Sequence, residues 1–375
     1  MDPIAPDTML ENIYDLPNLI NTKMKEFAEI VKNSLKEVDV RSIKKIFLVG
    51  DGDSFHAALS SEMSFESIAG IPCEVASGQK FLDYKAPFLL RERRDDYLVI
   101  GISASGTTKR VIQSLKATKK VGVKTLAVTT RAESAITEIA DSSIVLKIPA
   151  FPPSPGIRSF VASLSGLILI AVELGFLHER LSKDEKGEIL DTLLSLSDVM
   201  QMAIESTEDV AKAAAEDFKN TANLIFLGSG PSYGTAIFSA AKVIEANGVF
   251  SFGQDLEEWS HVEFFAYPDD MPVFIIAPPG RSFWRALETV EMVKSYGHRT
   301  AVVASAENKE IQKHADYFFP ISGDVREEFS SLVYHIGLDF FAYFLTKELD
   351  RHLFKSDNLE FQKLNEAYQK RDRIK

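Results

Sequence analysis

A loop in the first half of the sequence gathers hydroxyl groups around a glycine. The loop, Ser103–Thr108 (SASGTT), presents the hydroxyls of Ser103, Ser105 and Thr108, and a helical stretch, residues 108–121, follows directly. The first turn of a helix has amide groups without intrahelical partners and carries the positive end of the helix dipole. Such a loop can neutralise a phosphate monoester without a lysine. An ordinary Ser/Thr cap beside a glycine turn has the same pattern, and the loop alone leaves both interpretations open.

Two pairs of residues in the second half have types and spacings suited to proton transfer. Lys242 and Glu245 are three residues apart in a predicted helix and therefore share a face. His261 lies sixteen residues beyond Glu245 (261 − 245), and it shares a face with Glu258 if that segment is helical. A carboxylate near C1 and C2 of a sugar can move a proton between these carbons, and an imidazole near the ring oxygen can open the ring. Spacing alone favours the simpler interpretation, a surface ion pair and an ordinary histidine.

Short apolar runs alternate with helical stretches along most of the chain. These runs are the predicted strands: 44–50, 97–103, 125–129, 143–148, 223–228, 272–277, 300–304 and 316–320. Continuous apolar strands that alternate with helices are typical of a parallel sheet covered on both faces. A polar helix is expected between the third and fourth strands. The predicted fold class is therefore α/β.

The second half of the chain repeats the first. Gly50 and Gly52 correspond to Gly228 and Gly230, and the same offset of 178 positions (228 − 50) pairs Gly70 with Gly248. The order of strands and helices repeats as well, which predicts two tandem doubly wound domains. The expected boundaries are N-terminal helices at 1–42, a first domain at 43–178, a helical connector at 179–222, a second domain at 223–350 and a C-terminal tail at 351–375.

Loops at the carboxyl ends of the predicted strands are the expected ligand site of such sheets. Four of these loops are rich in small and hydroxyl residues: 50–54, 103–108, 228–232 and 278–282. None of them completes a dinucleotide fingerprint or a P-loop. A small phosphorylated molecule is therefore favoured over a dinucleotide or ATP.

Composition narrows the possible functions further. The chain has 375 residues, 45% of them hydrophobic and 26% charged, and a formal net charge of −12, so a globular protein without a nucleic-acid surface is expected. Cys73 is the single cysteine, and no histidine pair has zinc-site spacing, so no metal is predicted. The most apolar run, 161–177, contains Glu173 and is interpreted as a buried helix rather than a membrane span. We expect a cytoplasmic protein with no membrane partner.

Taken together, these motifs resemble the tandem sugar isomerase (SIS) domain family, and in particular the isomerase part of glucosamine-6-phosphate synthase. The resemblance covers about residues 10–360 and rests on Gly50–Ser54 (GDGDS), Ser103–Thr108, Lys242–Glu245 (KVIE) and Glu258–His261 (EWSH). It implies two SIS domains and an enzyme that needs no organic cofactor or metal. It also implies a homodimer whose active sites are shared between subunits.

The resemblance assigns roles to particular residues. The substrate phosphate is held by the hydroxyl loop, including Gly106, and by the serine of the first glycine loop; carried over, these are Ser54, Ser103, Ser105, Gly106 and Thr108. Glu245 moves the proton between C1 and C2, and His261 opens the sugar ring. Lys242 and Glu258 belong to the same expected catalytic set.

The sequence also departs from the family pattern. Asp51 and Asp53 replace small or uncharged residues beside the phosphate loop, and we expect Gly52 and Asp53 to contact sugar hydroxyls. Ala104 replaces a polar residue. No glutaminase domain with a terminal nucleophilic cysteine is present in the sequence, so we expect glutamine not to be the nitrogen source within this chain.

Several activities remain open at this stage. They are aldose–ketose isomerisation of a hexose 6-phosphate, deamination of an amino-sugar 6-phosphate, deglycation of a phosphorylated sugar–amine adduct, and sugar-phosphate sensing without turnover.

Overall fold

A computed structural model describes residues 2–89 and 94–372 of the chain. The described residues form two compact units, each of which contains one five-stranded sheet. Of the described residues, those within 19–150, 158–194 and 363–372 form the β1–β5 unit, and those within 2–18, 151–157 and 195–362 form the β6–β10 unit. Helix α2 (Leu16–Leu35) and the long helix α8 (Lys183–Phe218) each contribute residues to both units.

The first sheet has the strand order β2-β1-β3-β4-β5, and all of its pairs are parallel. Its strands are β1 (Lys45–Gly50), β2 (Cys73–Ser77), β3 (Tyr97–Ile102), β4 (Lys124–Thr129) and β5 (Ser142–Val145). The helices of this part of the chain are α2 (Leu16–Leu35), α3 (Asp53–Ser64), the π-helical turn η1 (Phe65–Ala69), α4 (Gly78–Lys80), the π-helical turn η2 (Phe81–Lys85), α5 (Ala86–Leu89), the short 3-10 turn η3 (Arg94–Asp96), α6 (Lys109–Lys120) and α7 (Ile157–Leu177).

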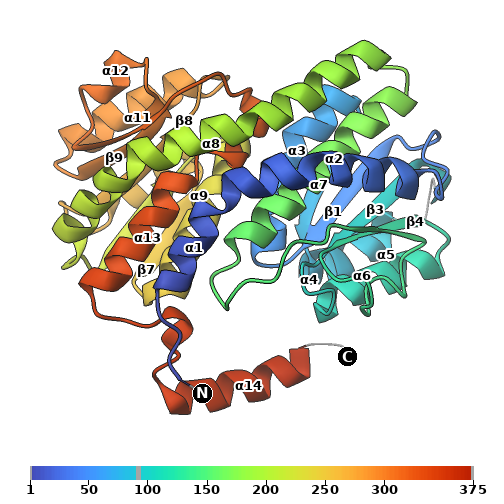
Figure 1. Ribbon diagram of the computed structural model, residues 1–375, viewed down its shortest axis with the longest axis horizontal. Helices are drawn as coiled ribbons and strands as arrows, with labels where there is room; N and C mark the ends of the chain where they lie inside the picture. The colour runs from blue at the N-terminus through green and yellow to red at the C-terminus, as the bar shows by residue number, and fades with distance from the viewer. Residues whose placement is uncertain (1, 90–93, 373–375) are drawn as a thin grey trace. The chain divides into compact units, whose positions relative to one another are not determined.

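Both faces of the first sheet are buried under helices (Figure 1). Phe47 and Val49 alternate along β1 and pack on one face against Val111 and Leu115 of α6. The residues between them on β1, such as Leu48, are equally buried on the other face. The apolar runs in the sequence therefore reflect strands that are covered on two sides.

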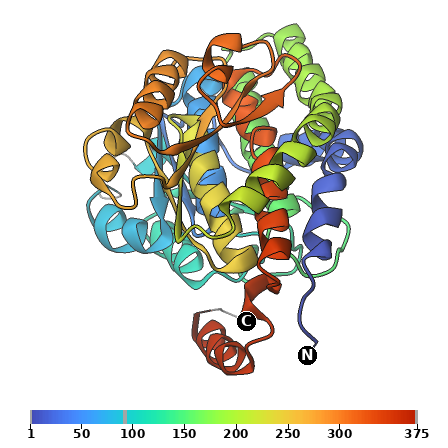
Figure 2. The same ribbon diagram turned by 90° about the vertical axis from the view of Figure 1, so that its left-hand side faces the viewer.

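The second sheet repeats this topology in the order β7-β6-β8-β9-β10, again wholly parallel. Its strands are β6 (Asn223–Leu227), β7 (Phe250–Gln254), β8 (Pro272–Ala277), β9 (Arg299–Ser305) and β10 (Tyr317–Ile321). Its helices, with the part of α8 from residue 195, are α1 (Asp7–Tyr14), α9 (Pro231–Asn247), α10 (Leu256–Trp259), η4 (Glu263–Phe265), α11 (Phe283–Ser295), α12 (Lys309–Gln312), η5 (Glu327–Leu332), α13 (Ile336–Glu348) and η6 (Leu353–Lys355), and α14 (Leu359–Asp372) follows. Figure 2 views this unit from its side and shows the strands between helices on both faces.

The predicted α/β class with two doubly wound sheets is confirmed, and each of the eight predicted strands is present. Two of the four edge strands, β2 and β7, were not predicted. The polar helix expected before β5 is wrong: residues 131–141 form bends and turns, held by bonds such as Ile136 N–H to the carbonyl of Gly106.

The apolar run in the middle of the chain is α7, the one helix in the described residues that is long and apolar enough to cross a membrane. Its most apolar window is 89% buried inside the protein. Burial of this kind is typical of the core helix of a globular domain, as the sequence predicted.

Candidate functional site

The hydroxyl loop joins β3 to α6 and is closed on itself by hydrogen bonds. The Oγ of Ser103 lies 2.8 Å from Oγ1 of Thr108, and the Oγ of Ser105 lies 3.0 Å from Oγ1 of Thr107. Gly106 has a φ of +70°, and a Cβ there would collide with the side chain of Ser134. Only glycine satisfies both conditions without strain. The loop therefore brings its four hydroxyls to the start of α6 in a fixed arrangement.

The end of β4 anchors this loop. The carbonyl of Ala104 accepts hydrogen bonds from the amide of Thr130 (3.3 Å) and from its hydroxyl (2.9 Å). Ala104 thus contributes its backbone rather than a side chain. An anion entering the loop would meet hydroxyls that can turn from one another toward it, and the amides of the first turn of α6.

The first turn of α6 carries two cations that the sequence reasoning missed. Lys109 and Arg110 directly follow the loop, and the turn contains no acidic residue. Both side chains are half-buried, and Nη1 of Arg110 donates to Gln113 at 2.7 Å. Cations are unfavourable at the positive end of a helix unless an anion is bound there. In the sequence, these two cations are visible as the letters KR directly after SASGTT.

The first glycine loop leaves the same edge of the sheet, because β1 and β3 are parallel neighbours. Gly52 precedes α3, and Ser54 in its first turn is 7% exposed. Asp51 accepts a hydrogen bond from the amide of Gly78 at 3.0 Å, so its carboxylate ties the loop to the start of α4. Asp53 lies 3.6 Å from Nδ1 of His56, which is itself buried.

In the other unit, Lys242 and Glu245 form a close ion pair on α9. Their Nζ and Oε2 atoms are 2.5 Å apart, which confirms the predicted shared face. The pair is not the surface ion pair that spacing alone favoured, because the side chain of Lys242 is 0% exposed while that of Glu245 is 36% exposed. The ammonium also lies 4.8 Å from the ring centroid of Phe238. A buried ammonium therefore fixes a carboxylate that solvent or a ligand can reach.

A second buried polar pair lies beside this helix on α13. Nδ1 of His335 is 2.6 Å from Oδ2 of Asp339, and both side chains are fully buried. The ring of His335 packs edge-on against Phe238, with centroids 5.5 Å apart. His335 is therefore a core residue. Asp339 was missed, since an isolated aspartate in an apolar helix offers no spacing signal.

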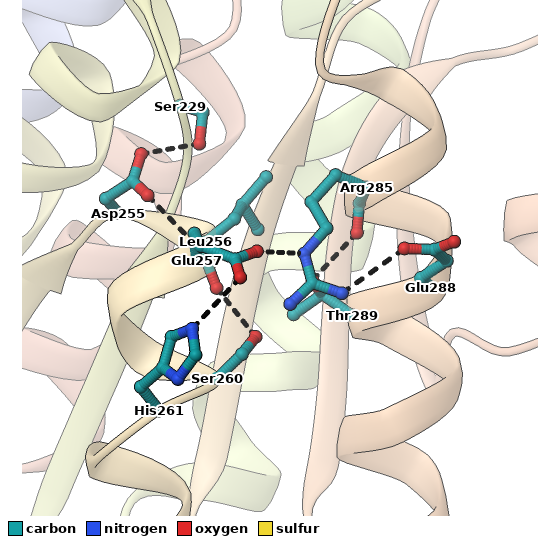
Figure 3. A network of polar contacts seen from close by, with 9 residues as sticks. All are labelled: Ser229, Asp255, Leu256, Glu257, Ser260, His261, Arg285, Glu288 and Thr289. Atoms are coloured by element: carbon teal, nitrogen blue, oxygen red, sulfur yellow. Dashed lines mark hydrogen bonds and ion pairs between the residues drawn. The ribbon is translucent and has the colours of Figure 1, made fainter.

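His261 belongs to a polar network at the carboxyl end of the second sheet (Figure 3). Its Nε2 is 3.1 Å from Oε1 of Glu257, whose Oε2 is 2.6 Å from Nε of Arg285. The hydrogen bond with His261 and the charge of Arg285 lower the pKa of Glu257. Arg285 also contacts Glu288, at 3.2 Å. All of these side chains except the half-exposed Arg285 are exposed.

The structure corrects the expected pairing of Glu258 with His261. Helix α10 ends at Trp259, so residue 261 is not on the helix that the three-residue spacing assumed. The side chain that His261 contacts is Glu257, four residues earlier, and Glu258 is exposed and offers His261 only its backbone carbonyl. Glu257 and Arg285 are the network members that sequence reasoning missed.

At the carboxyl end of each sheet, a side chain in the loop after β1 or β6 forms a hydrogen bond to the start of the helix that follows β2 or β7. The residue types at the matching positions are exchanged between the two units. In the β1–β5 unit the carboxylate of Asp51 holds the start of α4, whose N-cap is Ser77. In the β6–β10 unit the hydroxyl of Ser229 bonds Asp255, the N-cap of α10, at 2.5 Å. The offset of 178 pairs Asp51 with Ser229 and Ser77 with Asp255. In both units the residue after the first glycine thus bonds the start of the helix that follows β2 or β7, through the amide of Gly78 in one unit and the side chain of Asp255 in the other.

Comparison with known proteins identifies the family. The SIS domain model matches residues 39–172 and 217–345, more than half of the chain. The chain belongs to the SIS domain family. Each matched segment contains one of the two sheets.

Curated relatives of this SIS protein include glutamine–fructose-6-phosphate aminotransferases. Those of Methanothermobacter thermautotrophicus and Thermococcus kodakarensis are each 27% identical over 340 residues, which is 91% of this chain. The match covers 54% and 55% of these relatives, so the chain spans about half the length of the curated relatives it matches.

Solved structures share the fold. The C-terminal domain of glucosamine-fructose-6-phosphate aminotransferase from Francisella tularensis has a TM-score of 0.78 at 18% identity, over 93% of this chain and 98% of that one. Tagatose-6-phosphate ketose/aldose isomerase from Escherichia coli has a TM-score of 0.76 at 15% identity, over 95% and 97%. Glucosamine-6-phosphate deaminase from Thermotoga maritima has a TM-score of 0.67 at 21% identity, over 92% and 94%.

Proposed function

We propose that this protein processes a hexose 6-phosphate or an amino-sugar 6-phosphate, by opening the sugar ring and transferring a proton between C1 and C2. The names of its relatives and structural neighbours support this class, since they describe aminotransferases, isomerases and deaminases of sugar 6-phosphates. The proposal includes a homodimer with shared active sites and a cytoplasmic location.

The substrate phosphate is assigned to the hydroxyl loop. Ser103, Ser105 and Thr108 supply hydroxyls, Gly106 lets the backbone approach the ligand, and Ser54 contributes from the neighbouring loop. Gly52 and Asp53 are assigned to the sugar hydroxyls. The cations in the first turn of α6 support an anion at this position.

The proton chemistry is assigned to the other unit. His261 donates a proton to the ring oxygen, and the bond between that oxygen and the anomeric carbon (C1 of an aldose, C2 of a ketose) breaks. The proton on the anomeric hydroxyl or amine is released to solvent, which gives the open chain with a carbonyl or imine. Glu245 then removes a proton from one of C1 and C2 and returns it to the other through an enediol or enolamine. Lys242 holds the carboxylate in place, and Glu258 completes the assigned set.

The observation that carries this proposal is the Lys242–Glu245 pair. Burial of an ammonium is costly, and it persists here only with a carboxylate beside it. A protein that merely binds sugar phosphate has no need for a reachable carboxylate clamped in this way.

A substrate panel tests the proposal. The full chain is incubated with fructose 6-phosphate, tagatose 6-phosphate and glucosamine 6-phosphate, and with a fructose 6-phosphate adduct of an amino acid. Released ammonia, released amino acid and sugar interconversion are measured in parallel. Interconversion without ammonia identifies an isomerase, ammonia a deaminase, and amino acid a deglycase. Saturable binding without any product contradicts the enzyme proposal and favours a sensor.

A further inference from the structure

A cavity of about 350 Å³ lies within the β1–β5 unit, away from the strand ends. Three helices line it, each with residues spaced by three or four positions. The lining residues come from α2 (28, 29 and 32), α7 (169, 172, 173 and 176) and α8 (183, 186, 187 and 190). This volume lies at the lower end of the range found for small-molecule sites.

Part of the open space in the cavity lies at a helix position that lacks a side chain. Gly187 lies in the interior of α8 and lines the cavity, and a Cβ built on it would meet no atom within 4 Å. Its backbone is not in the left-handed region, so neither packing nor conformation requires glycine there. Glycine in a helix interior is destabilising relative to alanine. The glycine therefore carries a cost to the fold and leaves space open.

The wall of the cavity is mainly apolar. Leu169 and Val172 are buried on α7, and Phe176 and Leu190 continue the same surface. A hydrocarbon chain or small ring placed here would exchange water for apolar contact.

Charged side chains line one end of the cavity, and one of them, Glu173, is buried. Glu173 is 6% exposed and forms an ion pair with Lys186, whose ammonium also lies 4.7 Å from the centroid of the Phe176 ring. Lys32 is paired with Glu29 at 3.2 Å. Within the described part of the chain, Lys183 takes part in no such pair. Three ammonium groups thus face two carboxylates, which leaves one positive charge at the cavity.

We propose that this cavity binds a small anionic amphiphile, a carboxylate with an apolar body of about the length of a medium-chain fatty acid. Its apolar body lies along Leu169, Val172 and Phe176, and its carboxylate lies at Lys183 and Lys186. The proposal is independent of the sugar-phosphate activity, because it uses no residue assigned to that site.

Octanoate binding to the full chain, measured by calorimetry below the micelle concentration, tests the proposal. Octanol and octylamine have nearly the same apolar body and serve as neutral and cationic comparisons. We expect octanoate to bind at least fivefold more tightly than octanol, and octylamine to bind more weakly than either. Absence of octanoate binding, or equal binding of octylamine, overturns the assignment.

Substitutions at residue 187 locate the site. Gly187→Leu extends into the cavity and is expected to weaken octanoate binding at least tenfold, whereas Gly187→Ala leaves most of the space and retains binding. Both variants are expected to melt at higher temperatures than the parent when no ligand is present, because a glycine is removed from a helix. Unchanged octanoate affinity in Gly187→Leu contradicts the proposed location.

Lys183→Gln tests the contribution of the positive charge to binding separately from that of the apolar cavity. It is expected to abolish the preference of the site for octanoate over octanol while octanol affinity stays the same. If the preference survives, the excess charge at Lys183 does not select the ligand and the anionic class is wrong.

Discussion

Lys242 illustrates how much a single residue reveals when its surroundings are known. Its position three residues before Glu245 fits any helix with a surface ion pair, because residues three apart are neighbours on a helix surface. What distinguishes it is complete burial, with Phe238 on one side and the carboxylate on another. Phe238 in turn packs against His335 at the start of α13, about ninety residues later in the chain (335 − 242). No local pattern contains this information.

Glu257 is the residue that we expect to orient His261. Glu257→Gln keeps the shape of the side chain but removes the carboxylate held by Arg285, so the imidazole loses a fixed partner. We predict that kcat falls about tenfold, less than the roughly 10²-fold cost of a grossly misplaced catalytic group, while KM changes little. Steady-state kinetics on the best substrate measure this. Glu291→Gln on α11 is the control, and equal effects of the two variants would remove Glu257 from the account.

Glu62 on α3 should make the stability of the protein depend on pH. Burial raises the pKa of Glu62 to about 7, and the carboxylates of Glu66 and Glu74 add to the shift. Since the folded-state pKa lies above the ordinary value of 4.5, the native state binds more protons than the unfolded state between these pH values. The stability contributed by protonated Glu62 is therefore present below about pH 4.5 and is lost as the pH rises toward 7.

Glu62→Gln is accordingly predicted to stabilise the protein at pH 8 by on the order of 1 kcal/mol, after allowance for solvent screening of a half-buried group, and to have little effect at pH 4.5. Urea unfolding of both proteins at the two pH values measures the difference. The exposed Glu133→Gln serves as the control. A stabilisation that is the same at both pH values would show that Glu62 does not titrate as described.

At the scale of elements, the first turn of α6 carries two cations and no acidic residue, a combination that an ordinary helix N-terminus avoids. A carboxylate is the usual companion of a helix N-terminus, yet Lys109 and Arg110 are found there. We predict that Arg110→Gln raises KM for a sugar phosphate several-fold, while the unliganded protein is at least as stable, since a cation at this end costs about 0.3–1 kcal/mol.

Thermal melts with and without substrate test this prediction, alongside kinetics. Lys116→Gln, an exposed position in the middle of α6, controls for the loss of one positive charge. If the two variants bind substrate equally well, the first turn of α6 does not attract the phosphate.

Elements buried on both faces were the easiest to predict. The strand β3 was expected at 97–103 and is observed at Tyr97–Ile102, because its apolar run is longer than a helix turn and ends in small residues. The edge strands β2 and β7 have polar residues within five-residue segments and partly exposed side chains, such as Phe250 at 64%, so their patterns resemble loops. The sequence also does not indicate that α10 is only four residues long. For this reason Glu258, and not Glu257, was expected to be the partner of His261.

At the scale of the molecule, the sequence contains one α/β unit twice, and the two copies have diverged in chemistry. One copy retains a hydroxyl loop with cations behind it, and the other retains a buried ammonium, a reachable carboxylate and an imidazole network. Asp51 and Ser229 occupy matching positions and each bonds the start of the helix that follows β2 or β7, but Asp51 does so through a backbone amide and Ser229 through the side chain of Asp255. Glycine positions repeated at a fixed offset made the duplication predictable from the sequence.

The central claim is that Glu245 moves a proton between C1 and C2 of a sugar phosphate. Solvent-isotope exchange, followed by proton NMR in D2O with the best substrate of the panel, measures this directly. The wild-type protein should incorporate deuterium at C1 or C2, and Glu245→Gln should do so at least about 10²-fold more slowly while still binding the phosphate by phosphorus NMR. Glu310→Gln, an exposed carboxylate in the same unit, should exchange at the wild-type rate. Exchange at an undiminished rate in Glu245→Gln, or none in a wild-type protein that binds the sugar phosphate, would contradict the account.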